Sequence, residues 1–139
     1  MISLIVVHCS ATRPSMDIGA KEIKQWHTLP KPQGNGWRDI GYHYIIKRDG
    51  TVEKGREDNV RGAHVRGHNT GSLGVCLVGG ADSSGKPDSN FTRNQYAALE
   101  RLLTELSEAH GNPRVTGHRV LDSGKACPSF DIESWWKNK

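Results

Sequence analysis

The sequence has no apolar segment long enough to cross a membrane or to form the core of a secretory signal peptide. Its N-terminal apolar run extends only from Leu4 to Val7, and no basic residue precedes it. We therefore expect a protein made in the cytoplasm, with no signal peptide and no stable membrane association. If its substrate lies outside the membrane, another factor must release the protein through the membrane.

Cysteine is scarce, and charge of one sign is nowhere concentrated. Three irregularly spaced cysteines argue against a disulfide framework and favour reduced thiols. The net charge is +4, but no run of five or more like charges occurs, so binding to nucleic acid is not expected. The mild positive charge is consistent with an anionic polymer as partner or, more simply, with a soluble surface.

What is present is the composition of an ordinary folded domain. The 139 residues are 35% apolar and 24% charged, which excludes fibrous and disordered classes. No repeat, low-complexity stretch or linker divides the chain, so residues 1–139 are expected to form one domain, and a monomer is expected.

Apolar patterning predicts a mixture of strands and helices. We expect strands at 2–9, 42–48, 51–53, 73–78 and 114–117, and helices at 17–29, 93–110 and 131–137. Asp49 and Gly50 provide a hairpin turn. Asp17 is the expected cap of the first helix, and Thr92 with Gln95 forms a capping box for the second. The predicted fold class is α+β, a single domain with a central mixed sheet flanked by helices.

Two histidines and one cysteine suggest a metal site. His8 ends the first apolar strand, His118 follows the last strand, and Cys127 lies in a loop before a proline. Three such ligands would hold zinc and leave its fourth position open, as in catalytic sites. Spacing alone does not bring His8 to the other two, and a single histidine is more often a surface or core residue. No His-Glu-x-x-His pattern is present, so thermolysin-like base catalysis is not indicated.

The sequence gives less support to two other uses of these residues. A purely structural zinc would need a fourth ligand, and none is evident near His118 or Cys127. A Cys9 nucleophile activated by His8 is disfavoured, because neighbours on a strand point to opposite faces. Cys9 and Cys76 are most simply small, buried apolar residues.

Four segments carry a resemblance to a known family: VHCSAT at 7–12, GYHYIIKRDG at 41–50, GVCLVGG at 74–80 and KACPSFD at 125–131. In this order they resemble the phage lysozymes of the T-seven type. These enzymes are zinc-dependent N-acetylmuramoyl-L-alanine amidases, which share their fold with the peptidoglycan recognition proteins. The similarity extends from residue 4 to about residue 137.

The resemblance implies a function and roles for five residues. His8, His118 and Cys127 would hold one Zn²⁺ per chain, and Tyr42 and Lys125 would be catalytic. The substrate would be bacterial peptidoglycan, cut between N-acetylmuramic acid and L-alanine by a phage or prophage endolysin that reaches the wall after release. Zinc-bound water would attack the carbonyl. Lys125 would stabilise the oxyanion, while Tyr42 would either orient the water or pass a proton to the leaving amine.

Substrate-binding residues are less defined by the sequence. His64 and His68 lie in the Gly-rich segment 62–72, where one of them would line the cleft, although both are also typical of exposed loop histidines. Trp37 offers a ring that could stack on a sugar. The competing function is a non-catalytic peptidoglycan-binding module on the same fold. The presence of Cys127, supported by Tyr42, favours the enzyme.

Overall fold

The fold is built on one five-stranded mixed sheet. The structure is a computed structural model that describes residues 1–139. The strands are β1 (Leu4–Cys9), β2 (Tyr44–Ile46), β3 (Val52–Lys54), β4 (Ser72–Leu77) and β5 (Arg114–Gly117), in the spatial order β3-β2-β4-β1-β5. β1 is parallel to both of its neighbours, β4 and β5, and β2 is parallel to β4, whereas β3 is antiparallel. The predicted α+β class is confirmed.

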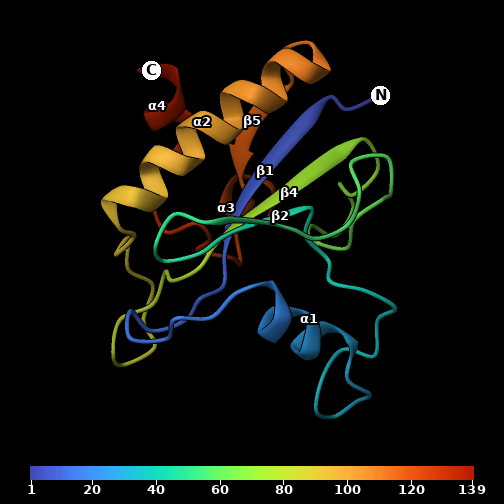
Figure 1. Ribbon diagram of the computed structural model, residues 1–139, viewed down its shortest axis with the longest axis vertical. Coiled ribbons are helices and arrows are strands. Elements are labelled where there is room, and N and C mark those ends of the chain that lie inside the picture. The colour runs from blue at the N-terminus through green and yellow to red at the C-terminus, as the bar shows by residue number, and fades with distance from the viewer.

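Helices cover both faces of the sheet (Figure 1). They are α1 (Ala20–Thr28), α2 (Arg93–His110), α3 (His118–Leu121) and α4 (Ile132–Lys137). α2 packs Leu99 and Leu103 on the face formed by Ile5 and Val7, and this is the larger apolar core. α1 contributes Ile23 to a smaller cluster on the opposite face. Because side chains of a strand alternate, the neighbours of Ile5 and Val7 along β1 point away from α2.

The helix starts show one correct prediction and one wrong one. At α2 the Thr92 hydroxyl accepts a 3.1 Å hydrogen bond from the Gln95 backbone N–H, so the predicted capping box is confirmed. At α1 the cap is Gly19, whose backbone N–H donates to the Glu22 carboxylate at 2.8 Å. Asp17 is exposed and precedes the helix, so its predicted role as the cap was wrong.

Two further boundaries differ from the sequence prediction. The strand expected at 42–48 is shorter, so Tyr42 precedes β2 rather than lying within it. The four-residue helix α3 was not predicted, because a single turn is too short to show an apolar period. It begins at His118 directly after β5, and this abrupt change of direction turns the histidine toward the end of β1.

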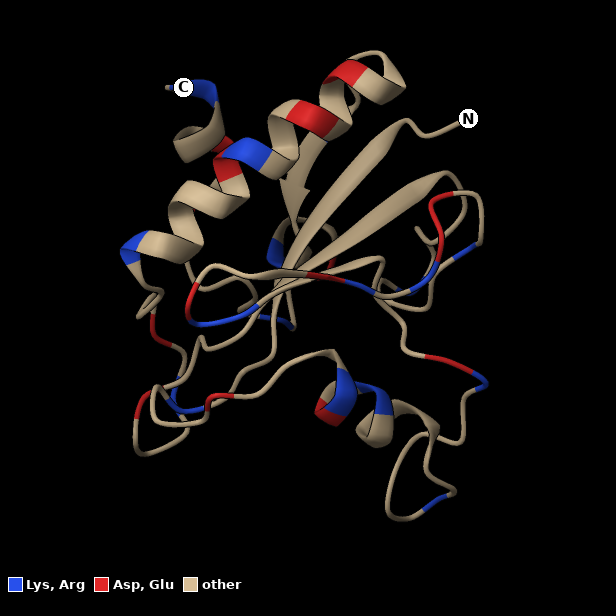
Figure 2. Cartoon of the chain, in the orientation of Figure 1, with Lys and Arg blue, Asp and Glu red and all other residues tan.

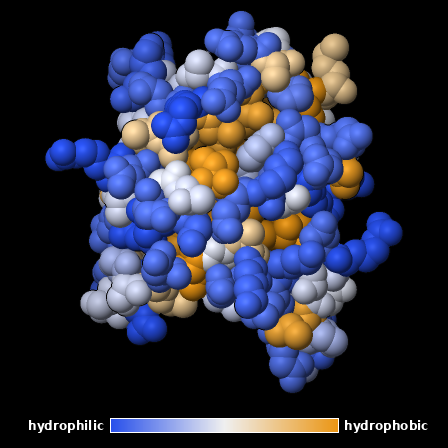
Figure 3. Space-filling model, viewed as in Figure 1, coloured by the Kyte–Doolittle hydropathy of each residue, from blue (hydrophilic) through white to orange (hydrophobic).

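Charged residues of both signs are distributed along the chain. Acidic and basic residues are interspersed on the helices and loops, while β1 and β4 carry none (Figure 2). The face in Figure 3 is mainly hydrophilic, with apolar atoms confined to patches between polar side chains. None of the helices combines the length and the apolar character needed to span a bilayer.

Candidate metal centre and catalytic cleft

The candidate site lies where two adjacent parallel strands end. Val7 of β1 is paired with Gly117, the last residue of β5. The residues that follow them in sequence, His8 and His118, therefore come together at the same edge of the sheet. Their Nδ1 atoms are 3.0 Å apart. The carboxyl ends of parallel strands are the usual position for ligand sites in such sheets. The fold thus joins two predicted metal ligands that are 110 residues apart in sequence.

A buried hydrogen-bond chain behind His8 determines which of its nitrogens carries the proton. Ser72 Oγ lies 2.7 Å from the His68 carbonyl and must donate its only proton to a carbonyl, so it accepts from His64 Nε2 at 3.1 Å. His64 Nδ1 is then an acceptor and receives the Nε2–H of His8 at 2.9 Å. The network therefore assigns the free lone pair of His8 to Nδ1, the atom that faces His118.

The ring of His64 fits because the facing strand carries a glycine. A Cβ on Gly74 would lie 2.6 Å from Cγ of His64, closer than packed atoms approach. Burial lowers the pKa of His64 to about 3, and burial together with the neighbouring histidines lowers the pKa of His8 well below its usual range. Both rings are therefore neutral at neutral pH, which is the form that binds metals.

Cys127 and His118 line one cleft, and the sulfur of Cys127 faces a second cysteine. The Sγ atoms of Cys9 and Cys127 are 3.0 Å apart. The thiol of Cys9, followed by the ring of His118, lowers the pKa of Cys127 and favours its thiolate. The same contact, together with burial, raises the pKa of Cys9 far above its usual range. Cys9 is buried as predicted, but it is also part of the site, which the sequence reading missed.

The predicted catalytic side chains line this cleft. Its volume is about 440 Å³, and its walls include Tyr42, Lys125, His118 and both cysteines of the pair. The ring of Tyr42 lies beside that of His8, with 5.2 Å between centroids, and burial raises the pKa of its phenol. The phenol therefore stays protonated at neutral pH. Lys125 is exposed and also lines the cleft, in the loop that carries Cys127.

The donors fit zinc in kind, although they are not arranged as a complete metal-binding group. Two nitrogen ligands of a tetrahedral zinc at about 2.0–2.1 Å are roughly 3.3 Å apart, close to the 3.0 Å between His8 Nδ1 and His118 Nδ1. Neutral imidazoles and a thiolate are the ligand forms that zinc requires. The sulfur of Cys127 lies 3.0 Å from that of Cys9, and the two imidazoles and this sulfur do not form a group of three donors around one metal position.

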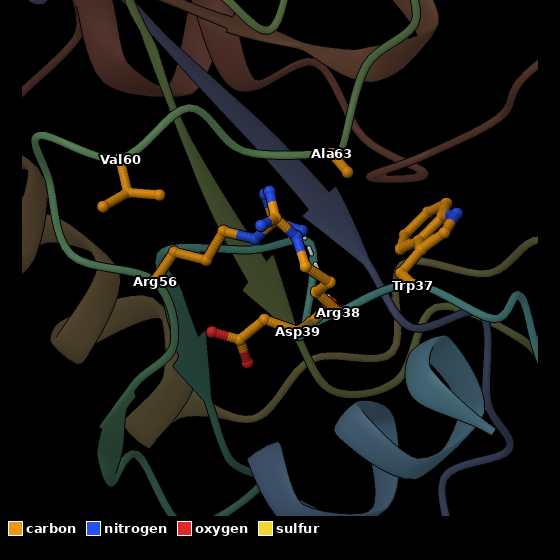
Figure 4. A pocket seen from close by; sticks show the side chains of 6 residues that line it. All are labelled: Trp37, Arg38, Asp39, Arg56, Val60 and Ala63. Atoms are coloured by element: carbon orange, nitrogen blue, oxygen red, sulfur yellow. Dashed lines mark hydrogen bonds between the residues drawn. The ribbon is translucent and has the colours of Figure 1, made fainter.

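Trp37 lies in a separate hollow connected to the site by a row of rings. Its indole packs on His27, His27 packs on Tyr42, and Tyr42 packs on His8, with centroid distances of 4.8, 5.4 and 5.2 Å. Figure 4 shows Trp37 and Val60 on opposite sides of the hollow, with two arginine side chains between them. The His27 ring thus lies between Trp37 of the hollow and Tyr42 of the cleft.

The two histidines predicted as alternative substrate contacts occupy different environments. His64 is buried, and both of its ring nitrogens have protein partners. His68 is exposed, and its carbonyl rather than its ring takes part in the chain behind His8. Neither ring lines the main cleft. The signal for the role of His64 was available only in the fold, because no sequence spacing relates residue 64 to residues 8 and 72.

Comparison with known proteins defines the class. A model of the N-acetylmuramoyl-L-alanine amidase family matches residues 1–130, and the chain belongs to this family. The expectation of an amidase is thereby confirmed, as is the family resemblance.

The similar proteins include phage endolysins and an amidase of known structure. The chain is 50% identical to the endolysin of Klebsiella phage KP32 over 135 residues, which cover 97% of this chain and 85% of the relative. It is also 50% identical to the endolysin of Escherichia phage T7 over 133 residues, covering 96% and 84%. Among solved structures, the N-acetylmuramoyl-L-alanine amidase LysC from Clostridium intestinale superposes with a TM-score of 0.76 at 25% identity, covering 94% of this chain and 78% of LysC.

Proposed function

We propose that the chain is a phage or prophage endolysin that hydrolyses the amide between N-acetylmuramoyl residues and L-alanine in bacterial peptidoglycan. One Zn²⁺ would be held by His8, His118 and Cys127. The observation that carries this proposal is the approach of His8 Nδ1 to His118 Nδ1, because the His118 ring lines a cleft that also contains Tyr42 and Lys125. Residues 1–139 would act as one catalytic domain and as a monomer, made in the host cytoplasm and active on the wall after release.

The metal would supply Lewis acidity toward the amide carbonyl and a nucleophile at neutral pH. Neighbouring residues keep the proposed ligands His8 and Cys127 in the protonation states that bind a metal. The hydrogen bonds from His8 to His64 and from His64 to Ser72 keep the Nδ1 lone pair of His8 directed toward His118. Cys127 offers a thiolate, because its surroundings lower the pKa of this thiol. We therefore assign His64 to the positioning of His8 rather than to substrate contact.

Lys125 and Tyr42 would act on opposite ends of the scissile amide. The ammonium of Lys125, two residues from Cys127 in the same loop, would stabilise negative charge as it develops on the carbonyl oxygen. The phenol of Tyr42 is protonated at neutral pH and would donate its hydrogen bond to the water or to the departing amine. Neither role requires a glutamate base.

The hollow beside Trp37 would hold a neighbouring part of the substrate. The indole is 38% exposed, which leaves a flat apolar surface for a sugar ring. Arg38 and Arg56 line the same hollow and would favour a substrate that carries carboxylates. Ring contacts through His27 link Trp37 in this hollow to Tyr42 in the cleft.

A non-catalytic peptidoglycan-binding module is the competing function. Such a module would need neither a thiolate ligand nor a protonated phenol beside the imidazoles. Both Cys127 and Tyr42 are present and line the cleft, which favours hydrolysis.

Mass spectrometry of digested muropeptides distinguishes these functions. Purified peptidoglycan treated with the protein should yield stem peptides with a free L-alanine amino group and glycan strands without peptide. New reducing sugar ends would instead indicate glycosidase chemistry. Undigested wall that still binds the protein would indicate the module.

A further inference from the structure

Two of the three cysteines form a pair inside the cleft. The Sγ atoms of Cys9 and Cys127 are 3.0 Å apart, and both residues line the cavity. No disulfide joins them, and all three cysteines are free thiols. The third, Cys76, is fully buried in the smaller apolar cluster, where its sulfur lies 3.8 Å from the Leu77 carbonyl and beside the Tyr42 phenol. The chain therefore provides one close thiol pair and one isolated thiol.

The backbone on both sides holds the pair in place. Cys9 is the last residue of β1, and Gly80 approaches it so closely that a Cβ there would lie 2.5 Å from the Cys9 sulfur. On the other side, the carbonyl of Cys127 accepts a 2.8 Å hydrogen bond from the N–H of Arg119 in α3. Because a disulfide bond is about 2.05 Å long, the sulfurs need to approach by only about 1 Å to be joined.

From this geometry we propose that Cys9 and Cys127 form an oxidisable pair, whose conversion to a disulfide competes with the metal for Cys127. The oxidant is a small-molecule disulfide such as oxidised glutathione. Cys127 is the more accessible thiol, since Cys9 is only 4% exposed. The Cys127 thiolate attacks one glutathione sulfur and expels the other as a thiol. Cys9 then loses its proton and attacks the Cys127 sulfur, which expels the second glutathione.

Overall, the two protein thiols are oxidised to one disulfide, and one molecule of oxidised glutathione is reduced to two glutathione thiols. The new bond occupies the Cys127 sulfur, so that sulfur is no longer a metal ligand. This second consequence rests on the proposed zinc set, whereas formation of the disulfide does not. Disulfides persist in oxidising compartments. The pair would therefore be oxidised when the protein moves from a reducing compartment to an oxidising one.

Peptide mapping of the full-length protein tests the pair directly. Zinc is removed with a chelator, and the reduced protein is incubated with oxidised glutathione under native conditions, alkylated and digested with trypsin. Lysines and arginines separate the three cysteines into three different tryptic peptides, so each pairing is readable. We expect a disulfide between the peptides of Cys9 and Cys127, loss of two of the three free thiols, and Cys76 alkylated only after unfolding. Both Cys9 and Cys127 remaining free, or glutathione remaining on Cys127 of the wild type, would overturn the proposal.

Variants and zinc complete the test. In Cys9→Ser the mixed glutathione adduct on Cys127 should accumulate, because no second thiol resolves it, while Cys76→Ala should form the disulfide as the wild type does. Equal adduct levels in Cys9→Ser and wild type would contradict the pairing. Saturating zinc should block the disulfide, and the oxidised protein should bind zinc only after reduction by a phosphine. If the disulfide forms but zinc binding is unchanged, the competition is refuted and Cys127 is not a ligand, whereas the thiol pair itself stands.

Discussion

His64 accepts a 2.9 Å hydrogen bond at Nδ1 from the Nε2–H of His8. Because the single N–H of the His64 ring, at Nε2, donates to Ser72 Oγ, this bond determines the tautomer of His8. The Nδ1 lone pair of His8, a proposed metal ligand, is thus directed by a residue that does not line the main cleft. Such partners are a general feature of metal-binding histidines.

Replacing His64 should therefore weaken zinc binding without removing a ligand. We expect His64→Ala to lower zinc affinity by roughly 10–100-fold, measured by competition with a chromogenic chelator. His68→Ala is the matched control, because His68 is exposed and only its backbone carbonyl takes part in the chain. Wild-type affinity in His64→Ala would show that the hydrogen bond does not orient His8.

Replacing Cys127 should remove a ligand outright. Cys127→Ser should lose its zinc during gel filtration and should no longer lyse cell walls, because a serine hydroxyl does not supply an anionic sulfur. Metal content and wall turbidity are the readouts. Cys76→Ala is the control for loss of a cysteine as such and should retain zinc. Full lysis by Cys127→Ser would exclude this sulfur from the site.

Replacing Lys125 or Tyr42 should lower the turnover number without changing the zinc content. Lys125→Ala should reduce kcat by about 10²–10³-fold, as expected for loss of one oxyanion-stabilising group. Tyr42→Phe should reduce it by about 10²-fold, because the ring still packs on His8 but the phenol proton is gone. Both variants should keep wild-type zinc content. Loss of zinc in either one would point to a structural role.

Stability should fall in acid partly because of His43. This ring is fully buried between the Gly74 N–H and the Val60 carbonyl, and burial lowers its pKa. The unfolded chain takes up a proton near pH 6.5 while the folded chain does not. The free energy of unfolding therefore falls as pH drops below about 6.5, by at most about 1.4 kcal/mol per pH unit from this residue, until the lowered pKa is reached.

Urea titrations of the chelated protein at several pH values measure this slope. Chelation removes any contribution from metal release. The slope between pH 6.5 and pH 5 should decrease in His43→Gln and remain unchanged in the exposed control His68→Gln. An unchanged slope in His43→Gln would show that His43 takes up its proton equally in both states.

Sequence patterns predicted the elements whose signals are local. The capping box of Thr92 and Gln95 and the apolar stripe of α2 are contained within a few turns, and the structure reproduces both. The cap of α1 was misjudged, because Asp17 is a better capping residue by type, yet Gly19 has the required backbone conformation. Residue type alone does not reveal which position lies at the helix start.

The site was only partly accessible to sequence reasoning. His8 and His118 could be proposed because each ends or follows a strand, but their contact depends on the pairing of β1 with β5. The role of His64 depends on a glycine in the facing strand. The contact between Cys9 and Cys127 contradicts the simple view of a buried apolar cysteine, since side-chain alternation says nothing about a loop that returns 118 residues later.

Anomalous diffraction at the zinc edge, from crystals grown with one equivalent of zinc, tests the central claim most directly. The account predicts a single strong peak bonded to His8 Nδ1, His118 Nδ1 and Cys127 Sγ, with the Cys127 sulfur turned from Cys9 toward the metal. A peak at other residues, or no peak in protein that still releases L-alanine-terminated stem peptides, would contradict it.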